Sequence, residues 1–568
     1  MSYAMSLYSH SKLSGLHSIR LLRLMPHEAK AAPIQCQLFN YSLRGKYEQP
    51  DLDDHTGTHL YEALSYVWGD SDKLQSISID NHDFPVTVNL YAALSHLRDC
   101  TIERIIWVDA VCINQADWEE RGRQVQLMAE IYSKANRVVV WLGIAADDSD
   151  GALEEIRVAA GNESTNPSGE KKNQQAILAL LQRPWFRRIW VLQEVAAARH
   201  ILIMCGSKDI DGYAFCLGLR PLRLSYATCP GLQSLIRSVT YLIRGSIFRP
   251  KHARSSSDKV SLDIRPLCEL IDMYHTHEAT ERCDKVYALL GMSSDNPSAA
   301  GLSPDYRIPW GRLFKHLIEY LLYGQVSAET WDDREMAVIK SKGCILGKVS
   351  LVKSHISWDD KQVVDITFKN TPRYLGDKME WSACWTLQVS AKPIRQGDLV
   401  CLLRGASQPT IIRPSKDYLA IIMIAITPLE DTGTQRKGAR GRALFPLVTN
   451  FPHDFLLVWK WEKSLGKFQD QEEYETLLKT VSQGPESLNP RLADQATRLW
   501  NMALILEDAE EYENAEKRLQ EAIRGYERMF GKEHPHTVKS MNKLGLVYKG
   551  KQQWKEAEKL FKQVTETR

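Results

Sequence analysis

The chain has 568 residues, of which 44% are hydrophobic and 25% are charged, so it can bury ordinary cores and is long enough for two or three domains. Its 72 Lys and Arg residues nearly balance its 70 Asp and Glu residues. Net charge therefore favours no interaction with nucleic acid, with a membrane surface or with an acidic partner.

The eleven cysteines are scattered singly, with no Cys-x-x-Cys pair and no cluster with histidines. This pattern argues against a metal site and against a disulfide framework. The start of the chain lacks the pattern of a signal peptide, and no later stretch approaches the length of a membrane span. We therefore expect a cytoplasmic protein with no bound metal or cofactor.

The first third of the chain alternates between strand-like and helical patterns. Two strand-like runs at 18–24 and 34–38 come first. Further strands are predicted at 63–67, 105–111, 138–142 and 200–205, with amphipathic helices at 90–97 and 121–135 between them. This alternation is typical of a parallel sheet with helices on both faces. It predicts an α/β domain over residues 18–210.

The middle of the chain changes character. Helical patterns at 262–292 and 310–322 predict a mainly helical extension over residues 211–345. Short β-like runs such as 399–403 and 418–426, separated by Gly and Pro, predict a small β-rich region over residues 346–465. Together these regions make a mixed α/β part, and residues 466–490 are expected to be a linker.

The last 78 residues, 491–568, contain an internal repeat. The segment 500–506, Tyr512 and Ala515 recur 42 residues later as the segment 542–548, Trp554 and Ala557. Such a period predicts stacked helical hairpins, with Trp500, Tyr512, Tyr548 and Trp554 filling the seams. The segment resembles tetratricopeptide repeats of the kinesin light chain type, which implies a protein partner. Since about three repeats are usually needed for stability, we expect this tail to pack on the preceding domain, to self-associate, or to be the remnant of a longer array.

Six blocks, in order along the chain, carry a second resemblance. They are YEALSYVWGD at 61–70, IIWVDAVCINQ at 105–115, ERGRQVQLMAEIYSKANRVVVWLG at 120–143, RPWFRRIWVLQE at 183–194, RCDKVYALLGM at 282–292 and GDLVCLLRGASQPTIIRP at 397–414. Over roughly residues 18–430 the chain resembles the fungal heterokaryon incompatibility (HET) family. This resemblance implies a role in self/non-self recognition that ends in programmed cell death.

Polar and aromatic residues gather where two predicted strands end. Carboxyl ends of parallel strands are where α/β sheets bind ligands, and Gly69 permits a tight turn with close backbone approach. Paired amides can hydrogen-bond a nucleotide or an amide. The candidate substrate-binding residues are Ser65, Tyr66, Trp68, Gly69, Asp109, Asn114 and Gln115. The alternative is that the aromatic residues belong to the core and that the polar ones cap helices or loops.

The segment after Pro184 is expected to form one helix, with Phe186, Trp190 and Glu194 at i, i+4 and i+8 on one face. A carboxylate on such an apolar segment must be paired, hydrogen-bonded or functional. The alternative to a functional Glu194 is an ion pair with Arg123, Arg187 or Arg188.

The order of strands and helices, followed by Trp-x-x-x-Glu, resembles Toll/interleukin-1 receptor (TIR) domains, which have a flavodoxin-like parallel sheet. In many such domains the corresponding glutamate cleaves NAD. The resemblance implies Glu194 as catalytic residue, Trp190 or Trp68 as a stacking partner, and NAD as substrate rather than as a bound cofactor. Val191 stands where the TIR signature has cysteine, and Arg188 where a small residue is common.

A second function stays open, in which the α/β domain assembles with copies of itself as a non-enzymatic scaffold and the repeats recruit a partner. Cysteine catalysis by Cys112 has no sequence cue for an activating histidine, and a buried thiol is usually inert. We interpret His275 and His277 as surface residues and the basic run 436–442 as solvated rather than RNA-binding.

Overall fold

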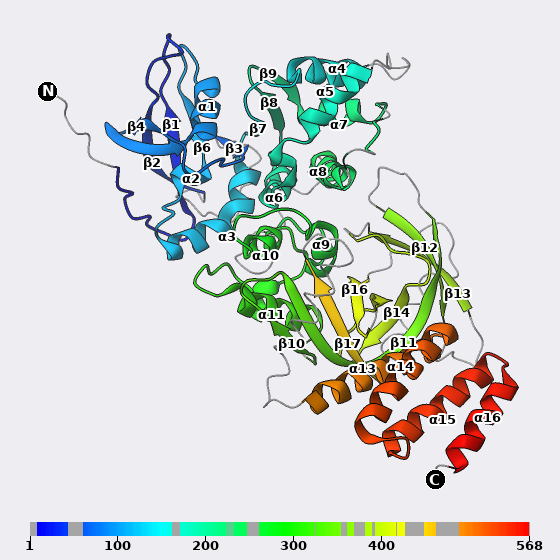
Figure 1. Ribbon diagram of the computed structural model, residues 1–568. Coiled ribbons are helices and arrows are strands. Elements are labelled where there is room, and N and C mark those ends of the chain that lie inside the picture. The colour runs from blue at the N-terminus through cyan, green and yellow to red at the C-terminus, as the bar shows by residue number, and fades with distance from the viewer. Residues whose placement is uncertain are drawn as a thin grey trace, which may run out of the picture. The chain divides into compact units, whose positions relative to one another are not determined.

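The computed structural model of the protein (Figure 1) describes residues 8–43, 61–161, 171–222, 224–226, 229, 231–246, 261–323, 325–353, 361–368, 381–388, 392–415, 417–426, 448–461 and 488–566. The basic run 436–442 lies outside these residues, and so does the expected linker up to residue 487. The chain divides into two compact units, with residues up to Ile308 in the first and residues from Pro309 onward in the second. The domain boundaries expected from the sequence stay predictions.

The first unit is built on a nine-stranded mixed sheet of order β5-β4-β2-β1-β6-β3-β7-β8-β9. Its strands are β1 (Ser18–Leu24), β2 (Gln35–Ser42), β3 (Glu62–Tyr66), β4 (Leu74–Ile79), β5 (His82–Thr87), β6 (Arg104–Trp107), β7 (Arg137–Trp141), β8 (Ile201–Cys205) and β9 (Lys208–Asp211). Four neighbouring strands, β6, β3, β7 and β8, are parallel. These four are the strands predicted between residues 61 and 206, so the α/β fold class is confirmed.

The parallel strands lie in the order second, first, third, fourth along the chain, as do the first four strands of a flavodoxin-like sheet. Antiparallel pairs extend the sheet on either side. β1 pairs antiparallel with both β6 and β2, and β9 pairs antiparallel with β8. The carboxyl ends of β3 and β6 therefore lie side by side in the middle of the sheet, and the strand order reverses next to them, between β3 and β7.

Helices fill the connections of the first unit. They are α1 (Val88–Leu97), α2 (Asp109–Cys112), α3 (Trp118–Lys134), α4 (Ser149–Gly161), α5 (Lys171–Leu181), η1 (Pro184–Arg187), α6 (Trp190–Ala197), α7 (Gly212–Leu219), α8 (Leu232–Ser246), α9 (Leu267–Tyr274), α10 (Asp284–Leu290) and η2 (Pro297–Ala300). Asp117 caps α3 by accepting hydrogen bonds from the backbone N–H groups of Glu119 and Glu120. α3 and α6 pack together, and α6 also contacts β3.

The prediction of one continuous helix after Pro184 is wrong. The segment forms the short 3₁₀ helix η1, an extended residue at Arg188, and then α6. Backbone hydrogen bonds to Glu278, a residue far along the chain, pull the backbone out of helical geometry at this point. Phe186 therefore does not share a helical face with Trp190 and Glu194.

The histidines at 275 and 277 are a second correction, because both are buried rather than on the surface. His275 and His277 lie just after α9, where their Nδ1 atoms contact the carbonyl oxygens of Ile271 and Tyr274. Local hydrogen bonds to the end of the helix let these rings enter the core. This burial could not be predicted from the helical pattern, since two histidines at i and i+2 do not share a helical face.

The second unit contains an eight-stranded, mostly antiparallel sheet next to α11 (Trp310–Leu321). Its strands are β10 (Ser327–Thr330), β11 (Met336–Lys353), β12 (Lys361–Phe368), β13 (Trp381–Gln388), β14 (Leu399–Leu403), β15 (Thr410–Pro414), β16 (Leu419–Met423) and β17 (His453–Lys460). The long strand β11 pairs with β10, β12, β14 and β17. The aromatic rings of Trp310, Phe314, Trp459 and Trp461 pack together beside it.

Four helices follow in the same unit: α13 (Leu488–Asp508), α14 (Tyr512–Phe530), α15 (Pro535–Gly550) and α16 (Trp554–Glu566). They form two hairpins stacked in chain order, as the 42-residue period predicts (Figure 1). α13 packs on β17, where Arg498 pairs with Asp417 at 3.2 Å and Asp508 with His453 at 3.1 Å. Of the three expectations for this tail, packing on the preceding region is the one found.

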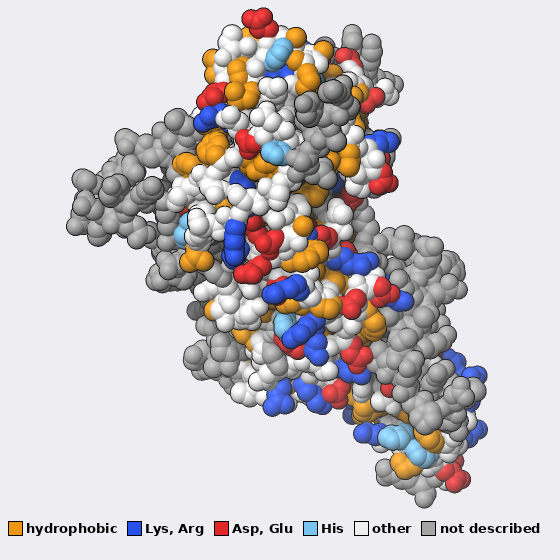
Figure 2. Space-filling view, turned by 90° about the vertical axis from the view of Figure 1, so that its left-hand side faces the viewer, with side chains coloured by type: hydrophobic (Ala, Val, Ile, Leu, Met, Phe, Trp, Pro, Cys, Tyr) orange, Lys and Arg blue, Asp and Glu red, His pale blue; other side chains and the backbone are white. Residues whose placement is uncertain are grey.

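Surface properties agree with the composition. Acidic and basic side chains are interleaved on the face seen in Figure 2, without a large region of one sign. Within the part of the chain that the structure describes, no helix combines the length and the apolar character needed to cross a bilayer. All eleven cysteines are free thiols.

Candidate active site

The ends of β3 and β6 bring together two of the predicted residues. The indole Nε1 of Trp68, just beyond β3, donates a hydrogen bond of 2.8 Å to Oδ2 of Asp109, the first residue of α2 after β6. The other carboxylate oxygen of Asp109 accepts from the backbone N–H of Ala110. Trp68 is 39% exposed, so this pair lies at the surface end of the site.

Glu194 and Ser65 form the buried end. The Ser65 hydroxyl, on β3, donates to Oε2 of Glu194, on α6. The same hydroxyl accepts a hydrogen bond of 2.9 Å from the indole N–H of Trp185. Glu194 is only 1% exposed, so the carboxylate lies inside the domain, between the sheet and the helices, and its hydrogen-bonding chain fixes its orientation.

Burial is the main influence on Glu194, and it raises the pKa of this carboxyl group from 4.5 to about 7. The positive charge of Arg188 and the hydrogen bond from Ser65 oppose the rise, whereas the negative charge of Asp109 adds to it. Among the described residues no Lys or Arg forms a direct ion pair with Glu194. The guanidinium of Arg188 instead donates to the backbone oxygen of Tyr66, so the ion pair considered as an alternative is absent there.

Two tyrosine hydroxyls complete the polar interior. Burial, followed by the charge of Asp109, raises the pKa of Tyr66 well above its usual value. Burial and the charges of Glu194 and Asp109 do the same for Tyr132, whose hydroxyl donates to the backbone oxygen of Leu64 at 3.0 Å. Both phenols stay protonated at neutral pH. The cluster therefore offers neutral hydrogen-bond donors next to two carboxyl groups and one guanidinium.

Gly69 lies in the turn after β3 with a φ of +85°, a conformation that glycine adopts without strain. A Cβ atom at this position would lie 3.3 Å from the Cβ of Asn89. Asn89 in turn donates to the backbone oxygen of Val67 and accepts from the Trp141 indole. The tight turn predicted from the sequence is thus present, and Asn89 holds it in place.

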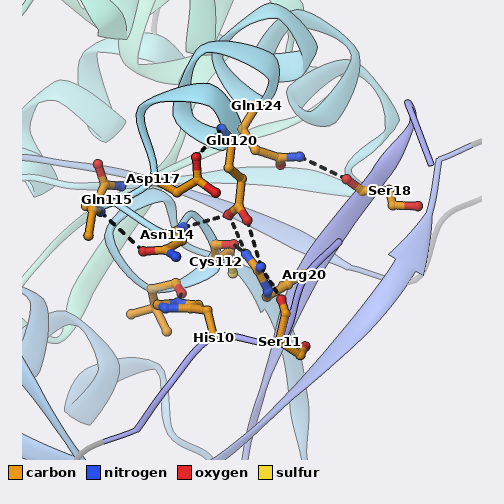
Figure 3. Close-up of polar contacts among 12 residues, drawn as sticks. His10, Ser11, Ser18, Arg20, Cys112, Asn114, Gln115, Asp117, Glu120 and Gln124 are labelled. Atoms are coloured by element: carbon orange, nitrogen blue, oxygen red, sulfur yellow. Dashed lines mark hydrogen bonds and ion pairs between the residues drawn. The ribbon is translucent and has the colours of Figure 1, made fainter. Parts of the chain in front are cut away.

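The other candidates have local roles. The Gln115 side chain donates to the backbone oxygen of Asp109 at 3.0 Å. Asn114 makes its contacts near Glu120, whose Oε1 accepts from the Asn114 N–H at 2.7 Å (Figure 3). Trp190 is buried, and it lies beside the Asp284 carboxylate. The structure brings Ser65, Glu194, Tyr66, Trp68 and Asp109 together. Asn114 and Trp190 instead make their hydrogen bonds with other groups, Glu120 and Ala116 for the first and Asp284 for the second.

A buried ion pair next to the site escaped the sequence analysis. Arg20, on β1, donates to both carboxylate oxygens of Glu120, on α3, at 2.6 and 2.9 Å. It also donates to the backbone oxygen of Cys112 at 3.0 Å (Figure 3). The two residues are 100 positions apart, and no local pattern links them. This pair ties the first strand to the loop that carries Asn114 and Gln115.

The Cys112 thiol is fully buried. Burial raises the pKa of Cys112 to about 12, so its thiol stays protonated and unreactive at neutral pH. Across the ranges that the structure describes, no three His, Cys, Asp or Glu side chains are grouped in a way that could hold a metal ion.

Comparison with known proteins gives two family matches. Residues 61–194 match the profile described as heterokaryon incompatibility protein (HET), and residues 494–568 match a tetratricopeptide repeat profile. The chain is also 29% identical to "Heterokaryon incompatibility protein 6, OR allele" of Neurospora crassa, in an alignment that covers 43% of this chain and 44% of that protein. The chain thus spans less than half the length of this curated relative.

No solved structure matches the chain, so the resemblance to TIR domains stays a prediction. The matched segment 61–194 begins at β3 and ends at Glu194 itself. It therefore contains Ser65, Trp68, Asp109 and Glu194. The chain carries a heterokaryon incompatibility domain over residues 61–194 and tetratricopeptide repeats over residues 494–568.

Proposed function

We propose that the protein is an effector of heterokaryon incompatibility that triggers cell death, and that its α/β domain hydrolyses NAD at Glu194. The domain match and the relative named for heterokaryon incompatibility support the biological role. The observation that carries the catalytic part is the buried Glu194 carboxyl group, held by Ser65 at the ligand-binding end of the parallel strands.

The reaction makes a demand that one buried carboxylate can meet. The bond between ribose C1′ and the nicotinamide nitrogen breaks, nicotinamide leaves as a neutral molecule with the bonding electron pair, and positive charge develops on the ribose. Water then adds to C1′ and releases a proton. A carboxylate in a dry site stabilises such a cation more strongly than one in water.

The surrounding residues have matching roles in this proposal. Ser65 and Trp185 hold the Glu194 carboxylate in one orientation. Trp68, partly exposed and fixed by Asp109, offers an aromatic face for stacking on a ring. The Asn114 side chain accepts from the backbone N–H of Ala116, and the Gln115 side chain donates to the backbone oxygen of Asp109. Both side chains would have to leave these contacts to orient an amide or phosphate of the substrate fully.

The test is nicotinamide release from NAD by the purified full chain at high protein concentration. Glu194→Gln keeps the shape of the side chain but cannot carry negative charge, so it should abolish release. Glu130→Gln is the matched control, because Glu130 is also a buried glutamate of this unit but pairs with Lys134 and His17. Release that continues in Glu194→Gln, or that is absent from the folded wild type, would remove the catalytic proposal.

The alternative is a scaffold without enzymatic activity, and the burial of Glu194 favours it, because a carboxyl group that is 1% exposed needs a rearrangement to meet a substrate. In that case the repeats recruit a protein partner, as tetratricopeptide repeats suggest. A cytoplasmic location fits the free thiols of all eleven cysteines, and an interaction with nucleic acid is not part of either proposal. Toxicity on expression that survives in Glu194→Gln would favour the scaffold.

A further inference from the structure

The two tail hairpins are related by the 42-residue repeat, so each contact between them identifies a residue that would make the same contact with a following hairpin. On α13, the Trp500 ring makes a cation–π contact with the Lys539 ammonium group, which lies 4.7 Å from the ring centre. Glu507, on the same helix, forms an ion pair with Lys543 at 2.6 Å. Leu504 lies between Trp500 and Glu507 on the same helical face and is half-buried. This face of α13 is covered by α15.

The next helix repeats the pattern. The Tyr512 ring, at the start of α14, lies against Gly550, because a Cβ atom there would be only 2.6 Å from the ring. Glu516 pairs with Lys551 at 2.7 Å and contacts the Tyr548 hydroxyl. The first hairpin thus presents one apolar and charged face to α15.

Adding 42 to these numbers gives the corresponding face of the second hairpin. It consists of Asn542, Leu546, Lys549, Trp554 and Glu558, and we call it the end face. All five residues are exposed, with Leu546 at 45% and Trp554 at 59%. Trp554 was expected to fill a seam between helices, and this is wrong, because its side chain is largely exposed. α16 is the outermost helix of the array (Figure 1).

We propose that the end face is a dimerisation surface, occupied by the end face of a second copy of this chain. A second copy cannot stack head to tail, because the opposite end of the array, α13, is packed on β17 through the pairs of Arg498 with Asp417 and Asp508 with His453. A closed two-fold arrangement remains, in which one surface meets itself.

The chemistry of the end face fits such a self-contact. It has an apolar centre of Leu546 and Trp554, and it carries both a lysine, Lys549, and a glutamate, Glu558. A surface with both signs can pair each charge with the opposite charge of its copy. A large exposed tryptophan is also the residue type that most often dominates the free energy of an interface.

The experiment is sedimentation equilibrium of the full chain over micromolar concentrations, for wild type, Trp554→Ala, Leu546→Ala and Phe530→Ala. We expect a wild-type dimer whose dissociation constant rises roughly thirtyfold in Trp554→Ala. Leu546→Ala should also raise the dissociation constant of the dimer. Phe530→Ala is the matched control, since Phe530 is 45% exposed on the same tail but lies outside the end face, and it should leave the dimer unchanged. Circular dichroism checks that each variant is folded.

A wild type that stays monomeric, a dimer insensitive to Trp554→Ala, or an equal loss in Phe530→Ala would each overturn the proposal. A chain extended at residue 568 by a further copy of residues 527–568 tests the other possible occupant of the end face, which is another helical repeat. If the wild type is monomeric and this extra hairpin raises the melting temperature of the tail, the end face belongs to another helical repeat and not to a second copy.

Discussion

Replacing Glu194 by glutamine should stabilise the protein at alkaline pH, because Glu194 is buried in a place that disfavours its charge. Its pKa is about 7 in the folded protein and 4.5 ordinarily, a difference of about 2.5. At about 1.4 kcal/mol for each pKa unit, this corresponds to about 3.5 kcal/mol. Glutamine resembles the protonated acid and can still accept the hydrogen bond from Ser65.

The direction of this stability change with pH follows from how many protons the folded and unfolded states bind. Between pH 4.5 and 7 the folded protein holds a proton on Glu194 that the unfolded chain has lost, so the wild type loses stability as the pH rises through this window. Above pH 7 nearly the full difference of about 3.5 kcal/mol is present. Glutamine does not titrate, so the stability of Glu194→Gln relative to the wild type should increase from pH 5 to pH 8.

Calorimetric melting of both full-length proteins at pH 5 and pH 8 measures this effect. For a unit of this size, about 3.5 kcal/mol shifts the melting temperature by about 5 °C. We expect a small difference between the variants at pH 5 and a higher melting temperature for Glu194→Gln at pH 8. A difference that is the same at both pH values would refute the reasoning, because it would mean that Glu194 does not change its charge in this range.

Three further predictions concern activity and packing. If the proposed NAD hydrolysis is found, kcat/KM should increase as the pH rises through about 7, since the ionised form of Glu194 is needed; a flat profile would exclude Glu194 as the titrating group. Arg20→Met should cost about 3 to 5 kcal/mol of unfolding free energy in urea, because it leaves the Glu120 charge buried without its partner, and the double variant Arg20→Met/Glu120→Gln should recover much of this loss. Gly218→Ala should lower the unfolding free energy by about 3 kcal/mol, because the new Cβ would lie 1.9 Å from the backbone oxygen of Ile156 where α7 meets α4. Gly161→Ala, with open space around its Cβ, is the control and should be neutral. Equal melting temperatures for the two variants would contradict the close packing at Gly218.

The parallel strands could be predicted from the sequence because each is a short apolar run between helical patterns, and they are confirmed to within a few residues. The hairpin of β4 and β5 was missed, although a signal exists. Its two-residue turn, Asp80 and Asn81, has positive φ at both positions, which these residue types tolerate. Pro85 within β5 hides the strand pattern, and it is tolerated because β5 is an edge strand.

The candidate site could be predicted only in part. Ser65, Trp68 and Asp109 could be placed together because strand ends in a parallel sheet share an edge. The break in the helix at Arg188 could not be foreseen, since it depends on backbone hydrogen bonds to Glu278, a residue far along the chain. Asn114 was a candidate because it follows a strand end, but position along the chain does not predict its local contacts with Glu120 and Ala116.

The ion pair of Arg20 and Glu120 has a consequence for where the α/β domain begins as a folding unit. The family match starts at residue 61, yet Glu120 within it depends on an arginine from β1. A fragment cut to the matched segment would keep a buried carboxylate and lose the cation that neutralises it. A fragment that includes Arg20 should therefore be more stable than one cut to the matched segment, so strand β1 belongs to the α/β domain although the family match begins after it.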